Sequence, residues 1–323
     1  MHVRAAILSE YQAPPALGER PAPQAGEGKA VVELRAAALN PADLAIASGS
    51  FPFGSPPLPY VPGIEGVGSI LQSDRHAPGT RVWACGRGLG VASDGTFAEK
   101  FLASDDVLVE VPADADDLLA AALGVVGLAA WMPLTWLAPV RPGETVLVLG
   151  ATGSVGSVAV QAAKILGAAR VVAVGRDVGR LEYIRELGAD AVVELGGDDF
   201  GERLAAAASG APPTLVLDAL WGAPLEAAAV VAGPGARIVH IGQSAAPTAT
   251  IASGLVRGKQ LQILGYSNFA VPQDALAKGY ADVVEHAVAG RIRLETEAVP
   301  LERVGEAWAR QAQGPDVKLV LVP

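Results

Sequence analysis

The sequence predicts an α/β protein in which a β-rich domain is followed by a doubly wound parallel sheet. Three observations support this fold class. A chain of 323 residues is long enough for about two domains. Strand-like and helix-like runs alternate from residue 144 onward. The stretch GATGSVG at 150–156 joins the first of these strands to the first helix, where such sheets bind their ligand.

The first part of the chain, to about residue 120, is expected to be rich in β-strands. Clusters rich in Pro and Gly, such as PAPQAGEG and GSPPLPYVPG, separate short apolar or alternating runs. The clearest of these runs are VRAAIL, KAVVELRAA, EGVGSI and TRVWACG. This texture predicts a barrel-like or irregular β domain.

The middle of the chain, from 144 to 266, predicts six strands with helical crossovers. Strands that alternate with helices in this way run parallel and form one twisted sheet. The expected strands are 145–150, 170–175, 191–195, 214–220, 236–242 and 261–266. The expected helices are 155–167, 177–187, 199–208 and 223–232.

The tail, from about residue 266, is expected to be helical over 273–290, because its apolar residues recur at helical spacing. It ends in the apolar run VKLVLVP at 317–323. A final strand this apolar must be buried, so we expect it to return to the first domain.

Residues 118–140 carry no charged side chain, and such a run is long enough to cross a membrane as a helix. The run consists mostly of small residues and contains Pro133 and Pro139. We therefore expect two buried helices, at 117–124 and 128–137, packed where two domains meet, rather than a membrane span.

The overall charge argues against a nucleic-acid partner. The formal net charge is −10, and Lys and Arg are scattered singly instead of forming basic patches. Cys85 is the one cysteine, which excludes an internal disulfide and fits a reducing compartment. The first residues contain too short an apolar stretch for a secretory signal, so a cytoplasmic location is expected.

The glycine-rich loop predicts a dinucleotide site. A strand, a glycine-rich turn and a helix place backbone N–H groups and a helix N-terminus against a diphosphate, and side chains on the glycines would block that approach. Glycines that merely pack a helix on a strand would look similar, but the position at the start of a βαβ series favours the dinucleotide. The expected contacts are Gly150, Ala151, Thr152, Gly153, Ser154, Val155 and Gly156.

The end of the second strand favours NADPH over NADH. A carboxylate there would accept the ribose 2′-hydroxyl of NAD. This chain has Gly175 followed by Arg176, with Arg180 one helical turn further on. A guanidinium can bind a 2′-phosphate through charge-assisted hydrogen bonds, which a carboxylate would repel. Asp177 leaves NADH use open.

Taken together, a series of short motifs resembles the medium-chain dehydrogenase/reductase superfamily, and within it the zinc-independent quinone oxidoreductase group. The motifs are ALNPAD at 38–43, PGIEGVG at 62–68, GTRV at 79–82, GTFAE at 95–99, GLAA at 127–130, the loop at 150–156 and GAD at 188–190. The resemblance covers almost the whole chain. It implies a GroES-like catalytic domain over 1–118 and 266–323 and a Rossmann NADPH-binding domain over 119–265.

The resemblance also implies that no metal is bound. The zinc-dependent alcohol dehydrogenases of the same superfamily hold zinc through Cys and His, but Asn40 stands in place of the first Cys and Ile64 in place of the His. The four histidines, which we expect to be ordinary surface or core residues, lie in unrelated segments. They are His2, His76, His240 and His286.

Without a Lewis acid, the expected chemistry is reduction of an acceptor that is already electrophilic, such as a quinone or an activated alkene. By resemblance, Asn40 and Ala129 lie near the nicotinamide. Gly242 and Gln243 follow the fifth strand, where the backbone of such folds runs past the nicotinamide.

The catalytic candidates are Asn40, Asp43, Tyr60 and Tyr266, the last as a proton donor. Asp43 would equally suit a capping or turn role. Aromatic candidates for an acceptor pocket are Phe51, Phe53 and Tyr60, which would equally suit core packing. Lys318 would either approach the phosphates or be exposed.

Two other functions remain open: reduction of an enoyl thioester or other activated C=C bond, and a structural or regulatory protein that binds NADPH but turns over little. A homodimer is expected because related proteins pair their sixth Rossmann strands edge to edge, here 261–266. The alternative is an edge covered by the tail.

Overall fold

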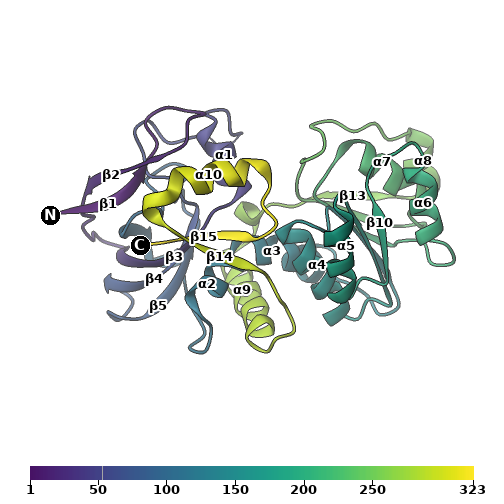
Figure 1. The fold of residues 1–323 in the computed structure, drawn as a ribbon. Coiled ribbons are helices and arrows are strands. Elements are labelled where there is room, and N and C mark those ends of the chain that lie inside the picture. Colours follow the sequence, from purple (N-terminus) through teal and green to yellow (C-terminus); the bar gives the residue numbers. More distant parts are fainter. Residues whose placement is uncertain (53) are drawn as a thin grey trace. The chain divides into compact units, whose positions relative to one another are not determined.

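The computed structural model describes residues 1–52 and 54–323, which form two compact units (Figure 1). Unit 1 contains residues Met1–Val126, Tyr280–Val288 and Leu294–Pro323. Unit 2 contains Gly127–Gly279 and Ala289–Arg293. Unit 2 is thus almost one continuous stretch of chain, whereas unit 1 is assembled from both ends.

Unit 1 is built on a mostly antiparallel sheet. Its strands follow the order β14-β15-β3-β4-β5-β7, with β6 also paired to β3, and β1 and β2 form a separate hairpin. The strands are β1 (His2–Ile7), β2 (Ala16–Pro21), β3 (Lys29–Ala38), β4 (Glu65–Gln72), β5 (Arg81–Cys85), β6 (Lys100–Ser104), β7 (Leu108–Glu110), β14 (Thr296–Pro300) and β15 (Lys318–Val322). The GroES-like β-rich fold predicted from the sequence is confirmed.

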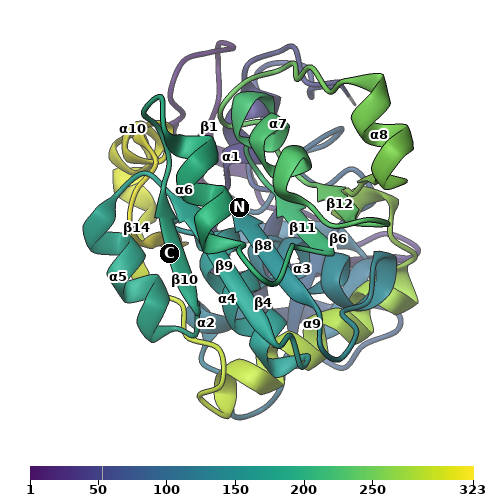
Figure 2. The ribbon, with the colours of Figure 1, turned by 90° about the vertical axis from the view of Figure 1, so that its right-hand side faces the viewer.

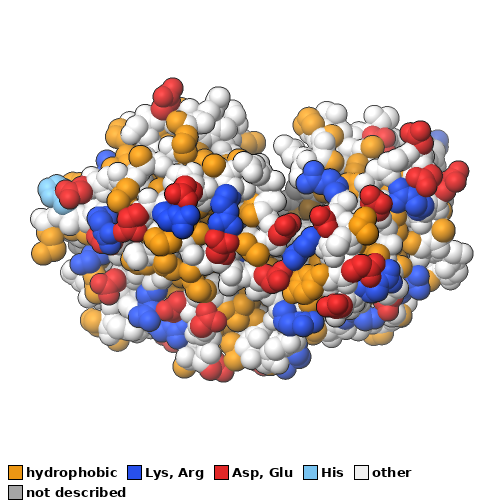
Figure 3. All heavy atoms as spheres, viewed as in Figure 1, with side chains coloured by type: hydrophobic (Ala, Val, Ile, Leu, Met, Phe, Trp, Pro, Cys, Tyr) orange, Lys and Arg blue, Asp and Glu red, His pale blue; other side chains and the backbone are white. Residues whose placement is uncertain are grey.

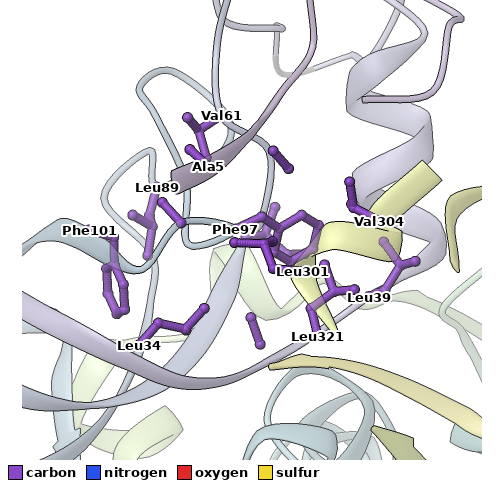
Figure 4. Packing of buried hydrophobic residues seen from close by; sticks show 14 of the residues in the cluster. Ala5, Leu34, Leu39, Val61, Leu89, Phe97, Phe101, Leu301, Val304 and Leu321 are labelled. Carbon is purple, nitrogen blue, oxygen red and sulfur yellow. The ribbon is translucent and has the colours of Figure 1, made fainter. Parts of the chain in front are cut away.

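The last strand of the chain completes this sheet, as predicted. β15 pairs antiparallel with β3 through Val320 and Ala38, and parallel with β14. Figure 4 shows the result: Leu301 and Leu321 from the tail pack against Phe97 and Leu39 from the first hundred residues. The apolar character of the tail is therefore explained by burial in the core of unit 1.

Unit 2 is a parallel six-stranded sheet of the Rossmann type, also as predicted. The strand order is β10-β9-β8-β11-β12-β13. Helices α4 and α5 lie on one face and α6 and α7 on the other (Figures 1 and 2). The strands are β8 (Thr145–Leu149), β9 (Arg170–Gly175), β10 (Ala191–Glu194), β11 (Leu215–Asp218), β12 (Arg237–His240) and β13 (Gln262–Gly265).

The helices differ from the predicted ones mainly at their ends and in number. The α-helices are α1 (Pro41–Ala47), α2 (Asp117–Ala122), α3 (Val125–Met132), α4 (Ser154–Ile165), α5 (Val178–Glu186), α6 (Phe200–Ala207), α7 (Gly222–Val231), α8 (Ser253–Lys259), α9 (Gln273–Val288) and α10 (Val304–Gln313). Short helical turns are η1 (Asp105–Val107), η2 (Pro133–Leu137), η3 (Asn268–Ala270) and η4 (Leu301–Arg303).

The uncharged run at 118–140 forms α2, α3 and the π-helical turn η2. The second predicted helix thus ends as a regular helix at Met132, because Pro133 has no N–H to continue the α pattern. Among residues 1–52 and 54–323, no helix is long and apolar enough to cross a membrane.

Charges of both signs are interspersed on the face shown in Figure 3. Exposed ion pairs among the described residues include Arg4 with Glu99 (2.7 Å) and Arg310 with Glu297 (2.6 Å).

Candidate active site

The glycine-rich loop links β8 to α4 in unit 2, and its shape depends on missing side chains. Gly150 has a φ of +84°, a region that favours glycine. A Cβ on Gly156 would lie 2.2 Å from Gly150 O, and one on Gly175 would lie 2.4 Å from Thr152 Cγ2. A side chain at Gly156 or Gly175 would therefore clash with the loop. The absence of these side chains lets the loop pack directly against the first turn of α4 and the end of β9.

Gly153 differs, because it faces open space. A Cβ there would meet nothing closer than Gly150 O at 3.6 Å. Gly153 is also the N-cap of α4, and no side chain of the described residues caps that helix. Ser157 N is the first amide to find a helical acceptor, Gly153 O at 2.9 Å, so the N–H groups of Ser154, Val155 and Gly156 have none within the helix. This open, uncapped N-terminus fits a diphosphate.

After β9 the chain carries the exposed side chain of Arg176, and the carboxylate of the next residue, Asp177, caps helix α5. Asp177 is the N-cap of α5, and its Oδ1 accepts a hydrogen bond from Arg180 N at 2.7 Å. The Arg180 guanidinium lies over the Tyr183 ring at 4.9 Å. The Arg176 side chain is exposed and forms no ion pair within the described part of the chain.

The remaining cofactor candidates of unit 2 are spread over two elements. The loop after β12 is held to the end of β11, since Ile241 N donates to Asp218 O (2.8 Å) and Ser244 N to Ala219 O (3.2 Å). Within this loop Gly242 is half-buried and Gln243 is exposed. Ala129 is half-buried on α3.

In unit 1, Asn40 lies at the centre of a buried hydrogen-bonded network. Lys318 Nζ donates to Asn40 Oδ1 (2.6 Å) and to Leu39 O (2.7 Å). Asn40 Nδ2 donates to Glu65 Oε1 (2.8 Å). Glu65 Oε2 accepts from Trp83 Nε1 (2.9 Å) and Val125 N (2.7 Å). Each hydrogen-bonding atom of the Asn40 side chain is thus engaged inside unit 1. The expectation that Lys318 is exposed was wrong, because it is 3% exposed.

Burial shifts the ionisation of the charged members of this network. Burial raises the pKa of Glu65, although Lys318 and the hydrogen bonds from Asn40 and Trp83 oppose the shift. Burial lowers the pKa of Lys318 to about 8, opposed by the nearby Glu65 and Asp43 carboxylates. The mutual attraction of these groups offsets part of the cost of removing them from water.

Asp43 serves as a structural acceptor at the start of α1. Its carboxylate accepts from Asn40 N (2.8 Å) and Ile64 N (3.0 Å), so it ties the helix to the strand connection before β4. Burial raises its pKa to about 7 despite these two hydrogen bonds. The capping role considered from the sequence is therefore present.

The two candidate tyrosines have different surroundings. Tyr60 is 2% exposed, and its hydroxyl has no hydrogen-bond partner among the described residues. Burial and the Asp43 carboxylate raise its pKa. Tyr266, after β13 in unit 2, donates to Asn268 Oδ1 at 2.6 Å, and burial raises its pKa. Both therefore keep their protons at neutral pH. Phe51 packs against the core of unit 1, and Phe53 lies outside the described residues.

No group of three or more potential metal ligands occurs within residues 1–52 and 54–323. Ile64 is fully buried, and Cys85 is buried as a free thiol. One histidine departs from the ordinary surface or core role expected from the sequence: His240 Nδ1 lies 3.0 Å from the buried carboxylate of Asp218. Because the two residues end neighbouring strands, the pairing could have been found by aligning the carboxyl ends of the predicted strands.

Comparison with known proteins finds a matching family model for each unit. The alcohol dehydrogenase GroES-like domain model matches residues 26–113, and the zinc-binding dehydrogenase model matches residues 154–284. The alcohol dehydrogenase of Geobacillus stearothermophilus is 28% identical over 97% of both chains. Quinone oxidoreductase-like protein 2 of Mus musculus is 26% identical over 99% of this chain and 92% of its own.

A stretch of 214 residues is 32% identical to a phenolphthiocerol/phthiocerol polyketide synthase polypeptide of Mycobacterium tuberculosis. It covers 66% of this chain but 10% of that protein, so the chain corresponds to about a tenth of its relative. The solved structure of an NAD-dependent alcohol dehydrogenase matches with a TM-score of 0.86 and 26% identity over 99% of both chains. The chain belongs to the medium-chain dehydrogenase/reductase superfamily of nicotinamide-dependent oxidoreductases.

Proposed function

We propose that the protein is an NADPH-dependent, zinc-independent reductase that delivers hydride to a quinone or enone-like acceptor. The observation that carries this proposal is the uncapped N-terminus of α4, open at Gly153, with the exposed Arg176 at the end of the next strand. The N–H groups suit a diphosphate, and the guanidinium suits a further phosphate on the adenosine ribose.

Asp177 supports NADPH over NADH because its carboxylate caps α5 through Oδ1. A carboxylate held in a cap is less available to accept the two ribose hydroxyls. Arg176 has no competing carboxylate partner among the described residues, so a phosphate can bind it without breaking an ion pair.

The type of acceptor is inferred from Asn40 and Ile64, which stand where zinc-dependent alcohol dehydrogenases have zinc ligands. Asn40 is held by Lys318 and Glu65, and the side chain of Ile64 has no atom that could bind a metal. A buried ammonium beside Asn40 would also repel a metal cation. When bound, reduced nicotinamide supplies a hydride, and an acceptor that already carries a conjugated carbonyl needs no Lewis acid to receive it.

A second candidate is reduction of an enoyl thioester or another activated C=C bond. The segment shared with a polyketide synthase favours this candidate. The two reactions use the same hydride donor and differ in the acceptor. An NADPH-binding structural protein with little turnover is the contrasting possibility.

The experiment is an assay of NADPH oxidation with naphthoquinones, enones and enoyl thioesters. We expect turnover with quinones or enones. Turnover with thioesters alone would favour the second candidate, and tight NADPH binding without turnover would favour the structural protein. Failure to bind either nucleotide would overturn the proposal.

Arg176→Ala tests the choice of nucleotide. It removes a hydrogen bond to a charged group, for which about 1.5–3 kcal/mol is typical, so NADPH affinity should fall about 10- to 100-fold while NADH affinity stays unchanged. The control is Arg185→Ala on the helix that follows, where the guanidinium lies 3.3 Å from Glu182. Equal effects of the two variants would contradict the assignment.

We also propose a cytoplasmic homodimer. β13 is an edge strand of the unit 2 sheet, and Ile263 on it is 42% exposed. An exposed apolar edge strand is suited to pair with a second copy of itself.

A further inference from the structure

A histidine and a buried carboxylate lie together at the carboxyl ends of two neighbouring parallel strands. His240 ends β12 and Asp218 ends β11, and the two are opposite each other in the strand register. His240 Nδ1 lies 3.0 Å from Asp218 Oδ2. The Asp218 side chain is fully buried, whereas that of His240 is 26% exposed. The pair thus has one end in the protein interior and one end open to solvent.

The hydrogen bonds around Asp218 define which imidazole nitrogen is available. Asp218 Oδ1 accepts from the backbone N–H groups of Leu220 (2.9 Å) and Trp221 (3.0 Å), so Oδ2 is left for the imidazole. A carboxylate oxygen accepts, so Nδ1 carries a proton and donates it. Nε2 has no hydrogen-bond partner within the described chain and is not buried. Nε2 is therefore the atom that can gain and lose a proton.

Trp221 keeps the imidazole in place on a second side. The ring centroids of Trp221 and His240 are 4.1 Å apart, with a tilt of 47°. Trp221 has φ +59° and ψ −171°, which is an unfavourable conformation for a large side chain. Such conformations persist where the surroundings enforce them, and they are concentrated at functional sites.

The strand order places this pair on the nicotinamide side of the nucleotide site. The sheet order reverses between β8 and β11, and a dinucleotide binds across that point. Its diphosphate belongs at the loop after β8 and its adenosine at the end of β9, beside Arg176. The other half must then extend over the ends of β11 and β12, where Asp218 and His240 lie.

We propose that His240 is the proton donor for reduction of the acceptor and that Asp218 is its positioning residue. This inference rests on the proposed function. Addition of hydride brings an electron pair to the acceptor and leaves an enolate or phenolate-type anion. Imidazolium Nε2 gives its proton to that anion, and the neutral imidazole then takes a proton from water. The acceptor gains H⁻ and H⁺ in total, and the dihydronicotinamide is oxidised by two electrons.

The first test does not depend on turnover. The chain has four histidines, so imidazole ¹⁵N signals can be assigned by comparing the wild type with His240→Gln. We expect the His240 signals to show a proton on Nδ1 and to move when NADP⁺ is added at saturation. His2, which is exposed on β1, should not respond. Unchanged His240 signals at full nucleotide occupancy would overturn the proposal.

The second test is kinetic. His240→Gln should bind NADPH within about twofold of the wild type, because it removes no diphosphate contact, while kcat should fall by about 10²-fold or more. Added imidazole should restore part of the lost rate. His2→Gln is the control and should be fully active. A His240→Gln enzyme as active as this control would refute the role of His240.

Asp218→Asn tests the positioning role of Asp218 separately from proton donation by His240. The amide introduced by this substitution could present its NH₂ group to Nδ1, so the imidazole tautomer should change while His240 remains, and kcat should fall with little change in NADPH affinity. If the wild type reduces none of the acceptors, the proposed function fails, and the NMR experiment still decides whether His240 borders the nucleotide.

Discussion

Alanine at Gly153 should weaken NADPH binding, whereas alanine at Gly156 should lower the stability of the fold, although both replace a glycine of the same loop. A Cβ at Gly153 meets only Gly150 O at 3.6 Å, and its φ of −81° suits any residue. The cost in folding free energy should therefore be that of Ala in place of Gly at an N-cap, at most about 1 kcal/mol. Because the methyl group stands where the diphosphate approaches, NADPH affinity should fall at least about tenfold.

At Gly156 the new Cβ would lie 2.2 Å from Gly150 O and 2.5 Å from Ala151 Cα, both backbone atoms. An ordinary contact requires the loop to move by about 1 Å, and overpacking of this kind costs about 1–3 kcal/mol. The free energy of unfolding, measured with urea and circular dichroism, should fall accordingly. Gly201→Ala, on α6 with open space around it, is the control for both variants.

Fluorescence titration with NADPH then completes the comparison. We expect Gly153→Ala to be folded and poor at binding, and Gly156→Ala to be less stable. If Gly153→Ala binds NADPH as tightly as Gly201→Ala does, the diphosphate does not lie against this loop. If Gly156→Ala is as stable as the wild type, the close packing of loop and helix is not as the structure shows.

Three further predictions concern stability and assembly. Tyr60→Phe removes a buried hydroxyl that lacks a partner among the described residues, so the free energy of unfolding should rise by about 1 kcal/mol in urea titrations; a fall would mean that the hydroxyl has a favourable partner in solution. The pKa of Asp43 is raised from 3.8 to about 7, so the folded state binds its proton more tightly than the unfolded chain, and its contribution to stability is lost as pH rises from 4 through 7. Relative to the wild type, Asp43→Asn should therefore gain up to about 4 kcal/mol between pH 4 and pH 8, and a pH-independent difference would contradict the shifted pKa. Ile263→Lys on the β13 edge should convert the dimer to a monomer in light scattering, whereas Val230→Lys, on α7 and 62% exposed, should leave the mass unchanged; a monomeric wild type would exclude the dimer.

Long periodic patterns made most of the fold predictable from the sequence. Each of the six strands of unit 2 is a run of apolar residues, the first four are each followed by a helical run, and all six strands appear in the structure in parallel register. Short elements were missed, among them β2, β7 and α8. These carry little burial of their own, so their sequences show no period, and their pairing depends on distant parts of the chain.

The site was predictable where backbone geometry requires glycine and less so where side chains meet across elements. The loop at 150–156 has a local signature, since its glycines contact one another. The network of Asn40, Glu65 and Lys318 joins positions 278 and 25 residues apart through hydrogen bonds to Asn40. The spacing of these residues along the chain does not predict that their side chains form hydrogen bonds with one another. His240 differs: its partner Asp218 lies on another strand, and the contact follows only when the two predicted strands are aligned at their carboxyl ends.

The position of β15 has a consequence for synthesis on the ribosome. Strands β3 to β7 emerge early, yet the Ala37–Ala38 end of β3 must wait for residues 318–322 before it is paired. Unit 2, which is almost continuous from 127 to 279, can close while the ribosome is still translating the tail. A nascent chain should therefore acquire protease resistance in its middle first, and the sheet of unit 1 should be completed only after residues 318–322 have left the ribosome.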